Sequence, residues 1–96
     1  MNEIEALFED KSINRSGIFL YSKENALQII DECKKRNIVL LGIDGFYLGE
    51  NTTEPSMENS VDFSMRPFTE SIYEDAIAFL KARNDRLHFE IVYSEG

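Results

Sequence analysis

The sequence has little of what several classes of protein require. Its 96 residues include one cysteine, two prolines, one histidine and no tryptophan. A single cysteine excludes a disulfide within the chain, which fits a reducing compartment. No apolar run approaches the roughly 18 residues of a membrane-spanning helix. The acidic start of the sequence lacks the basic and apolar regions of a secretory signal. We therefore expect a cytoplasmic protein.

Basic residues are also scarce. Ten lysines and arginines stand against 18 aspartates and glutamates, which gives a net charge of −8. This charge repels phosphate backbones and anionic membrane surfaces, so it disfavours nucleic-acid and membrane binding. The one basic cluster, at 34–36, falls where a helix is expected to end, and cations stabilise that end of the helix dipole. An acidic chain is better suited to a basic protein partner, because opposite fields raise association rates.

Length and periodicity predict a single α+β domain over 1–96. Residues 1–15 are expected to form a short helix and a loop, and 16–96 the core. The predicted order is a short helix followed by β-α-β-β-β-α-β. Because two amphipathic helices need a sheet to cover their apolar sides, we expect a two-layer sandwich, with two main helices packed on a mixed β-sheet. The predicted strands cover 18–21, 38–41, 46–48, 61–65 and 87–93.

Local signals predict where the two main helices begin and end. Ser22 can cap the first helix, and Asn37 can end it in the left-handed conformation. Ser71 and Glu74 have the spacing of a capping box at the start of the second helix. The strands on either side of the first helix are expected to pair in parallel as a right-handed βαβ unit.

Two further segments are expected to be irregular. The Asp44-Gly45 pair between apolar residues predicts a hairpin turn, because a type I′ turn needs positive φ at both central residues. The alternative is that Gly42 marks a β-bulge. The segment 49–60 contains a proline and several turn-forming residues and has almost nothing to bury, which predicts a long surface loop.

Side chains suited to catalysis are few. His88 is the only histidine, and Glu90 two positions later could orient it as a general base. A solvated or hydrogen-bonded strand histidine is the simpler interpretation. Cys33 falls on the apolar side of the first main helix, as a small core residue does. The sequence has no nucleophile elbow, phosphate-binding glycine loop or metal-ligand spacing. We therefore expect no enzymatic activity, cofactor or metal.

In one interval of the sequence, every charged residue is acidic. Between Arg36 and Arg66 there is no lysine or arginine, and Glu50, Glu54 and Glu58 fall in the expected loop. One interpretation is a loop that increases solubility. The other is a negative surface that binds lysines and arginines of a partner, with apolar side chains at its centre. The candidate partner-binding residues are Tyr47, Glu50, Glu54, Met57, Glu58 and Asp62.

The apolar run that starts at Ile38 continues as L-G-x-D-G-F, from Leu41 to Phe46. This pattern resembles the core motif of small bacterial immunity proteins, which are encoded beside polymorphic toxins, including those of contact-dependent growth inhibition. The family that it resembles is immunity family number forty. The resemblance extends from the helix containing Ala26 to the final strand. It implies a non-catalytic protein that binds a cognate toxin C-terminal domain in the cytoplasm, often a nuclease, and covers its active site or a nearby surface.

The leading hypothesis is therefore an immunity protein that neutralises a toxin domain with a basic substrate groove. A first alternative is a nucleic-acid mimic that inhibits a defence nuclease. A mimic should spread carboxylates over much of its surface, whereas both predicted helices contain basic residues. A second alternative is a small hydrolase that uses His88. The identity of the toxin and the oligomeric state stay open.

Overall fold

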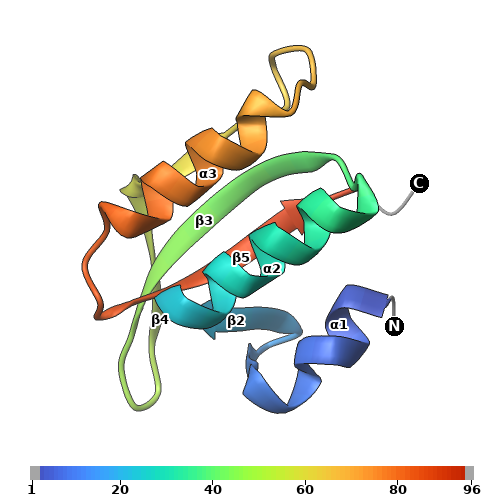
Figure 1. Ribbon diagram of the computed structural model, residues 1–96. Helices are drawn as coiled ribbons and strands as arrows, with labels where there is room; N and C mark the ends of the chain where they lie inside the picture. The colour runs from blue at the N-terminus through green and yellow to red at the C-terminus, as the bar shows by residue number, and fades with distance from the viewer. Residues whose placement is uncertain (1–2, 95–96) are drawn as a thin grey trace.

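The computed structural model describes residues 3–94 and has an α+β fold, with helices packed on a sheet (Figure 1). The predicted α+β class is thereby confirmed. The predicted order of elements is wrong, because two strands, not one, precede the first main helix and two, not three, lie between the main helices. The helices are α1 (Glu3–Phe8), the 3-10 helix η1 (Glu9–Lys11), α2 (Lys23–Arg36) and α3 (Ser71–Lys81). The strands are β1 (Ile13–Arg15), β2 (Ile18–Ser22), β3 (Leu40–Leu48), β4 (Thr53–Asp62) and β5 (Leu87–Tyr93). The predicted domain, 1–96, includes residues 1–2 and 95–96, which lie outside the described residues.

The strands form one sheet in the order β1-β2-β5-β3-β4, and every neighbouring pair is antiparallel. The predicted mixed sheet is therefore wrong. The predicted pairing of the strands that flank α2 is also wrong, because β5 lies between β2 and β3. This last strand of the chain pairs with β3 over most of its length and with β2 at Tyr21 and Ser22.

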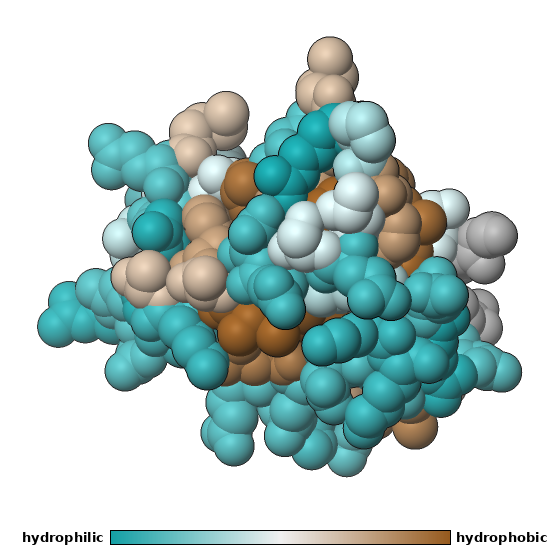
Figure 2. Space-filling view, turned by 45° about the horizontal axis from the view of Figure 1, so that its top comes forward, coloured by the Kyte–Doolittle hydropathy of each residue, from teal (hydrophilic) through white to brown (hydrophobic). Residues whose placement is uncertain are grey.

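Helices α2 and α3 cover one face of the sheet (Figure 1). Alternate residues of β5, Leu87, Phe89 and Ile91, point toward them and are buried in the core. Cys33 of α2 is buried there as predicted, and burial, with a smaller effect of Glu32, raises the pKa of its thiol to about 12. Figure 2 shows the helical side tilted forward, where hydrophilic residues make up most of the surface and hydrophobic residues are visible between them.

The helix ends follow the predicted signals in α2 but not in α3. The Ser22 hydroxyl accepts a hydrogen bond from the Asn25 amide at 3.3 Å, and Asn37 ends α2 with φ of 58°. Helix α3 begins at Ser71 itself, and its N-cap, Glu70, makes no side-chain capping bond. The predicted capping box is wrong because the Ser71 hydroxyl is 2.6 Å from the Thr69 hydroxyl and bonds with it instead.

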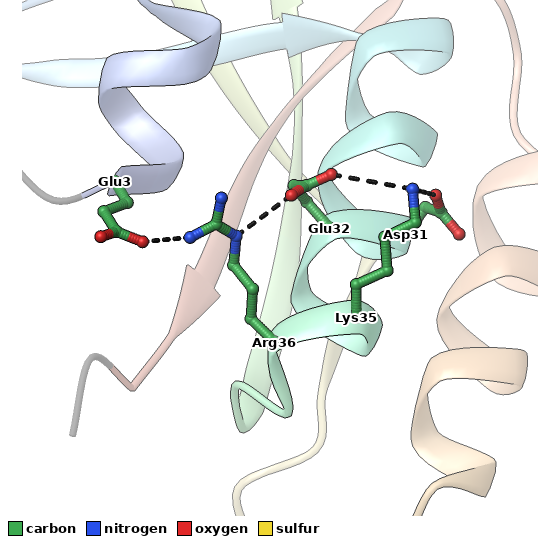
Figure 3. A network of polar contacts seen from close by, with 5 residues as sticks. All are labelled: Glu3, Asp31, Glu32, Lys35 and Arg36. Atoms are coloured by element: carbon green, nitrogen blue, oxygen red, sulfur yellow. Dashed lines mark hydrogen bonds and ion pairs between the residues drawn. The ribbon is translucent and has the colours of Figure 1, made fainter.

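The N-terminal helix α1 is held against α2 by apolar burial and by a chain of charges (Figure 3). Ile4 is 2% exposed and Phe8 is also buried. Arg36 of α2 pairs with Glu3 of α1 and with Glu32 at 3.1 Å. Lys35 then joins Glu32, at 4.0 Å, to Asp31, at 3.2 Å. The segment after α1, predicted as a loop, contains the short strand β1, which pairs with β2.

Candidate partner-binding surface

Strand β3 runs without a turn from Leu40 to Leu48, so the predicted hairpin turn at Asp44-Gly45 is wrong. The glycines of this segment serve a different purpose. A Cβ atom added to Gly45 would lie 2.3 Å from the carbonyl oxygen of Asn59, and one added to Gly42 would lie 2.9 Å from that of Val61. The backbone of β4 therefore approaches β3 so closely at both positions that a side chain does not fit.

Strand β4 contains a large bulge where it approaches β3 at Gly45. Ser56 pairs with Gly45 and Val61 pairs with Ile43, so five steps along β4 match two steps along β3. The Ser60 hydroxyl donates to the Ser56 carbonyl at 2.7 Å and accepts from the Gly45 amide at 3.1 Å. We call residues 57–60 the β4 bulge. The alternative prediction, a β-bulge at Gly42, is confirmed, because the register of β3 with β5 shifts between Leu40 and Gly42.

The predicted loop over 49–60 is mostly strand. The turn between β3 and β4 takes up only residues 49–52, and β4 begins at Thr53. Strand β4 is an edge strand with one neighbour, none of its side chains is buried, and apolar and polar residues do not alternate along it. We call β3, this turn and β4 the hairpin. All six predicted partner-binding residues lie on it.

The structure divides these six residues into two groups. At the turn end of the hairpin, Tyr47 and Glu54 lie opposite each other in register, and Glu50 lies in the turn. Tyr47 is 41% exposed. At the bulge end, Met57 and Glu58 belong to the β4 bulge and Asp62 is the last residue of β4. The side chain of Met57 is 86% exposed.

The carboxylates of the hairpin form no ion pairs. Within residues 3–94, no ion pair involves Glu50, Glu54, Glu58 or Asp62. Two guanidinium groups that reach the hairpin bind its carbonyl oxygens instead. Arg15 reaches from β1 to the carbonyls of Gly49 and Thr52, both at 3.0 Å. Arg83, after α3, donates to the Glu58 carbonyl at 3.3 Å. The hairpin therefore presents negative charge to solvent.

Asp62 is held in its charged form by Ser64, two positions later. Its Oδ1 accepts hydrogen bonds from the Ser64 hydroxyl at 2.6 Å and from the Ser64 amide at 2.8 Å. These bonds lower the pKa of the Asp62 carboxyl below its ordinary value, because they favour the ionised form.

A concavity of about 530 Å³ lies beside the bulge end, on the face of the sheet opposite α2 and α3. We call it the open-face pocket. Residues predicted to bind a partner, Met57 and Asp62, line it together with Asp44. Asp44 was predicted in a turn and was therefore not among the candidate residues. The available signal was the nearby pair Gly42 and Gly45, because glycines within a strand mark close approach of another backbone.

His88 lies on the same open face, because its neighbours Leu87 and Phe89 point into the core. Its Nδ1 has no hydrogen-bond partner among the residues described, and burial lowers the pKa of its imidazole. Burial and the charge of Asp44 raise the pKa of the Glu90 carboxyl. No hydrogen bond joins His88 to Glu90 in the part of the chain that the structure describes, so the general-base pair of the alternative interpretation is not formed in this conformation.

Residues 3–94 contain neither a cluster of metal-ligating side chains nor a membrane-spanning helix. No group of three or more histidine, cysteine, aspartate or glutamate side chains is arranged to hold a metal ion. No helix in this range is both long enough and apolar enough to span a membrane.

Comparison with known proteins leaves the site to be interpreted from its own chemistry. The sequence matches no protein-family model, and no curated protein matches it either.

Proposed function

We propose that this chain is an immunity protein that binds a toxin domain and neutralises it without turnover, in the cytoplasm, and that the hairpin is its binding surface. The observation that carries the proposal is the set of exposed, unpaired carboxylates along the hairpin. Nucleases hold a phosphate backbone in a basic groove, and carboxylates can take the place of phosphates there. The resemblance of Leu41–Phe46 to immunity proteins points to the same function.

The hairpin also offers the apolar contacts that a stable complex needs. Charges alone raise the association rate, whereas affinity depends on a few side chains buried at the centre of the interface. Met57 and Tyr47 are exposed among the carboxylates and are suited to this role. Methionine is flexible and polarisable, so Met57 can adapt to an irregular partner surface.

The test is the binding of the C-terminal domain encoded by the gene immediately upstream. We expect the triple variant E50Q/E54Q/E58Q to associate with this domain more slowly and with a weaker dependence on salt, as measured by stopped flow. The matched control E9Q/D10N/E74Q removes the same number of charges from exposed positions outside the hairpin. It should change the association rate much less, because local charge dominates at physiological salt.

Three results would contradict the proposal. Equal association rates for the triple variant and the wild type would show that the hairpin is not the binding surface. Loss of neutralisation in H88A with binding unchanged would favour the hydrolase. Inhibition of nucleases in general, rather than of the one encoded nearby, would favour the nucleic-acid mimic.

A further inference from the structure

The open-face pocket combines apolar walls with negative charge. Leu41, Val61 and Val92 line it, and the exposed side chain of Met57 stands at its rim. Asp44 and Asp62 contribute carboxylates from neighbouring strands. No helix within residues 3–94 covers this face of the sheet, so the pocket opens to solvent (Figure 1). Its volume and its mainly apolar lining with a few polar groups are typical of binding sites.

The charges around the pocket are not balanced by the protein itself. Glu90 of β5 lies directly opposite Asp44 in register, which places two carboxylates side by side on the open face. Like charges in this position destabilise a sheet. Within the described residues, no ion pair involves Asp44, Asp62 or Glu90. The charge of Asp44 helps to raise the pKa of Glu90, after burial. A cation from outside would relieve this repulsion.

Resting on the proposed function, we propose that the open-face pocket receives one lysine or arginine side chain of the toxin. The long aliphatic part of such a side chain packs against Leu41, Val61 and Val92, and its charged end reaches Asp44 and Asp62. Lysine and arginine combine these two properties, and neither an acidic nor a purely apolar side chain satisfies both parts of the pocket. Met57 closes over the aliphatic part from the rim.

The proposal assigns different kinetic roles to the two ends of the hairpin. Carboxylates at the turn end act mainly on association. In the free protein Asp62 is also exposed and Asp44 is half-buried, but the cation that enters the open-face pocket is desolvated, so removal of these two carboxylates acts mainly on dissociation. Met57 and Asp62 were predicted in one group with the turn-end residues, and the pocket separates them.

The test compares two variants that each remove two charges. We expect D44N/D62N to dissociate from the toxin domain at least about tenfold faster with little change in association, since losing a close charge pair costs 1.4 kcal/mol or more. E50Q/E54Q should slow association and leave dissociation nearly unchanged. Both variants are close to isosteric, and circular dichroism with urea unfolding checks that they fold. Equal dissociation of D44N/D62N and the wild type would overturn the proposal.

A double-mutant cycle identifies the cation. Each lysine and arginine on the toxin surface is replaced by methionine, and dissociation is measured against wild type and D44N/D62N. We expect one such replacement to have a large effect on the wild type and almost none on D44N/D62N. Independent effects at every basic residue would overturn the proposal. Absence of any binding by the wild type would overturn the proposed function and this inference with it, whereas normal binding without coupling overturns this inference alone.

Discussion

Two regions of the molecule hold their carboxylates in opposite ways. Between α1 and α2, Glu3, Glu32 and Asp31 are each paired with Arg36 or Lys35 in a continuous chain (Figure 3). Along the hairpin, no carboxylate has an ion-pair partner within residues 3–94. The difference follows from the sequence, because basic residues cluster in the last turn of α2 and are absent from the hairpin.

The comparison separates charges that hold the fold together from charges that are free to act on a partner. On the helical side, charge pairs add to the apolar docking of α1. On the hairpin, the guanidinium groups of Arg15 and Arg83 bind backbone carbonyls and leave the carboxylates exposed. Charged edge strands also resist edge-to-edge association, so the hairpin charges serve solubility even in the absence of a partner. Variants on each side test the distinction.

The largest effect should come from the apolar part of the helical side. We expect I4A to lower the free energy of unfolding by about 2–4 kcal/mol, because Ile4 is 2% exposed and its removal leaves a cavity under α1. Leu7 of the same helix is 52% exposed, so L7A should cost about 0.5 kcal/mol or less. Urea unfolding measures both. A cost for I4A as small as that of L7A would show that the charge chain, and not burial, holds α1.

The next effect concerns the hairpin itself. We expect G45A to destabilise the protein by about 1–3 kcal/mol, because its Cβ would meet the Asn59 carbonyl oxygen at 2.3 Å and push the β4 bulge away. G49A is the matched control. Its Cβ would meet only the rotatable hydroxyl of Thr52, so the cost should stay below about 1 kcal/mol. Equal losses of stability in G45A and G49A would mean that the close approach of β4 to β3 is not the reason for glycine at position 45.

A smaller effect is expected from the charge chain. R36Q removes the link between Glu3 and Glu32 and should lower Tm by a few degrees at low salt, with the difference shrinking as salt is added. K11Q, at an exposed residue outside the ion pairs, should leave Tm unchanged. Differential scanning fluorimetry measures this. In the proposed function, R36Q and the wild type should bind the toxin domain equally well. Weaker binding by R36Q would show that the charges between α1 and α2 also act on the partner.

The smallest effect concerns one carboxyl group. S64A removes the hydroxyl bond to Asp62 and leaves the amide bond, so the pKa of Asp62 should rise part of the way toward its ordinary value of 3.8. A lowered pKa in the folded state stabilises the protein above the ordinary pKa, and this contribution is lost as pH falls through the lowered value. S64A should therefore lose less stability between pH 5 and 2, which NMR titration and urea unfolding can check. An unchanged pKa would show that the amide alone is responsible.

Local chemistry was enough to predict the fold class, α2 and β5. Both ends of α2 depend on residues within one turn of the helix, so Ser22 and Asn37 were recognised directly. The alternation of Leu87, Phe89 and Ile91 identified β5 in the same way. These features need no information about distant parts of the chain.

Contacts between distant residues were not predictable in the same way. Gly45 was predicted in a turn. Its position requires glycine because the Asn59 carbonyl lies too close for a side chain, and that approach depends on the path of β4. The strands on either side of α2 were predicted to pair with each other, because no local feature of the sequence shows that β5 inserts between them. The six candidate residues were predicted on two strands and a long loop, whereas the structure places them on one hairpin, and their division between the turn end and the bulge end depends on the register of β3 with β4.

The β4 bulge has a consequence for how such a protein can change over generations. Its four residues lie outside the matched register of β3 and β4, while β5 pairs with the opposite side of β3. Asn59 and Ser60 fix the bulge against Gly45, whereas the side chains of Met57 and Glu58 are exposed, so substitutions at these two positions alter the rim without shifting the strands beneath it. If the hairpin is the binding surface, its specificity can change at these two positions while the scaffold is inherited intact.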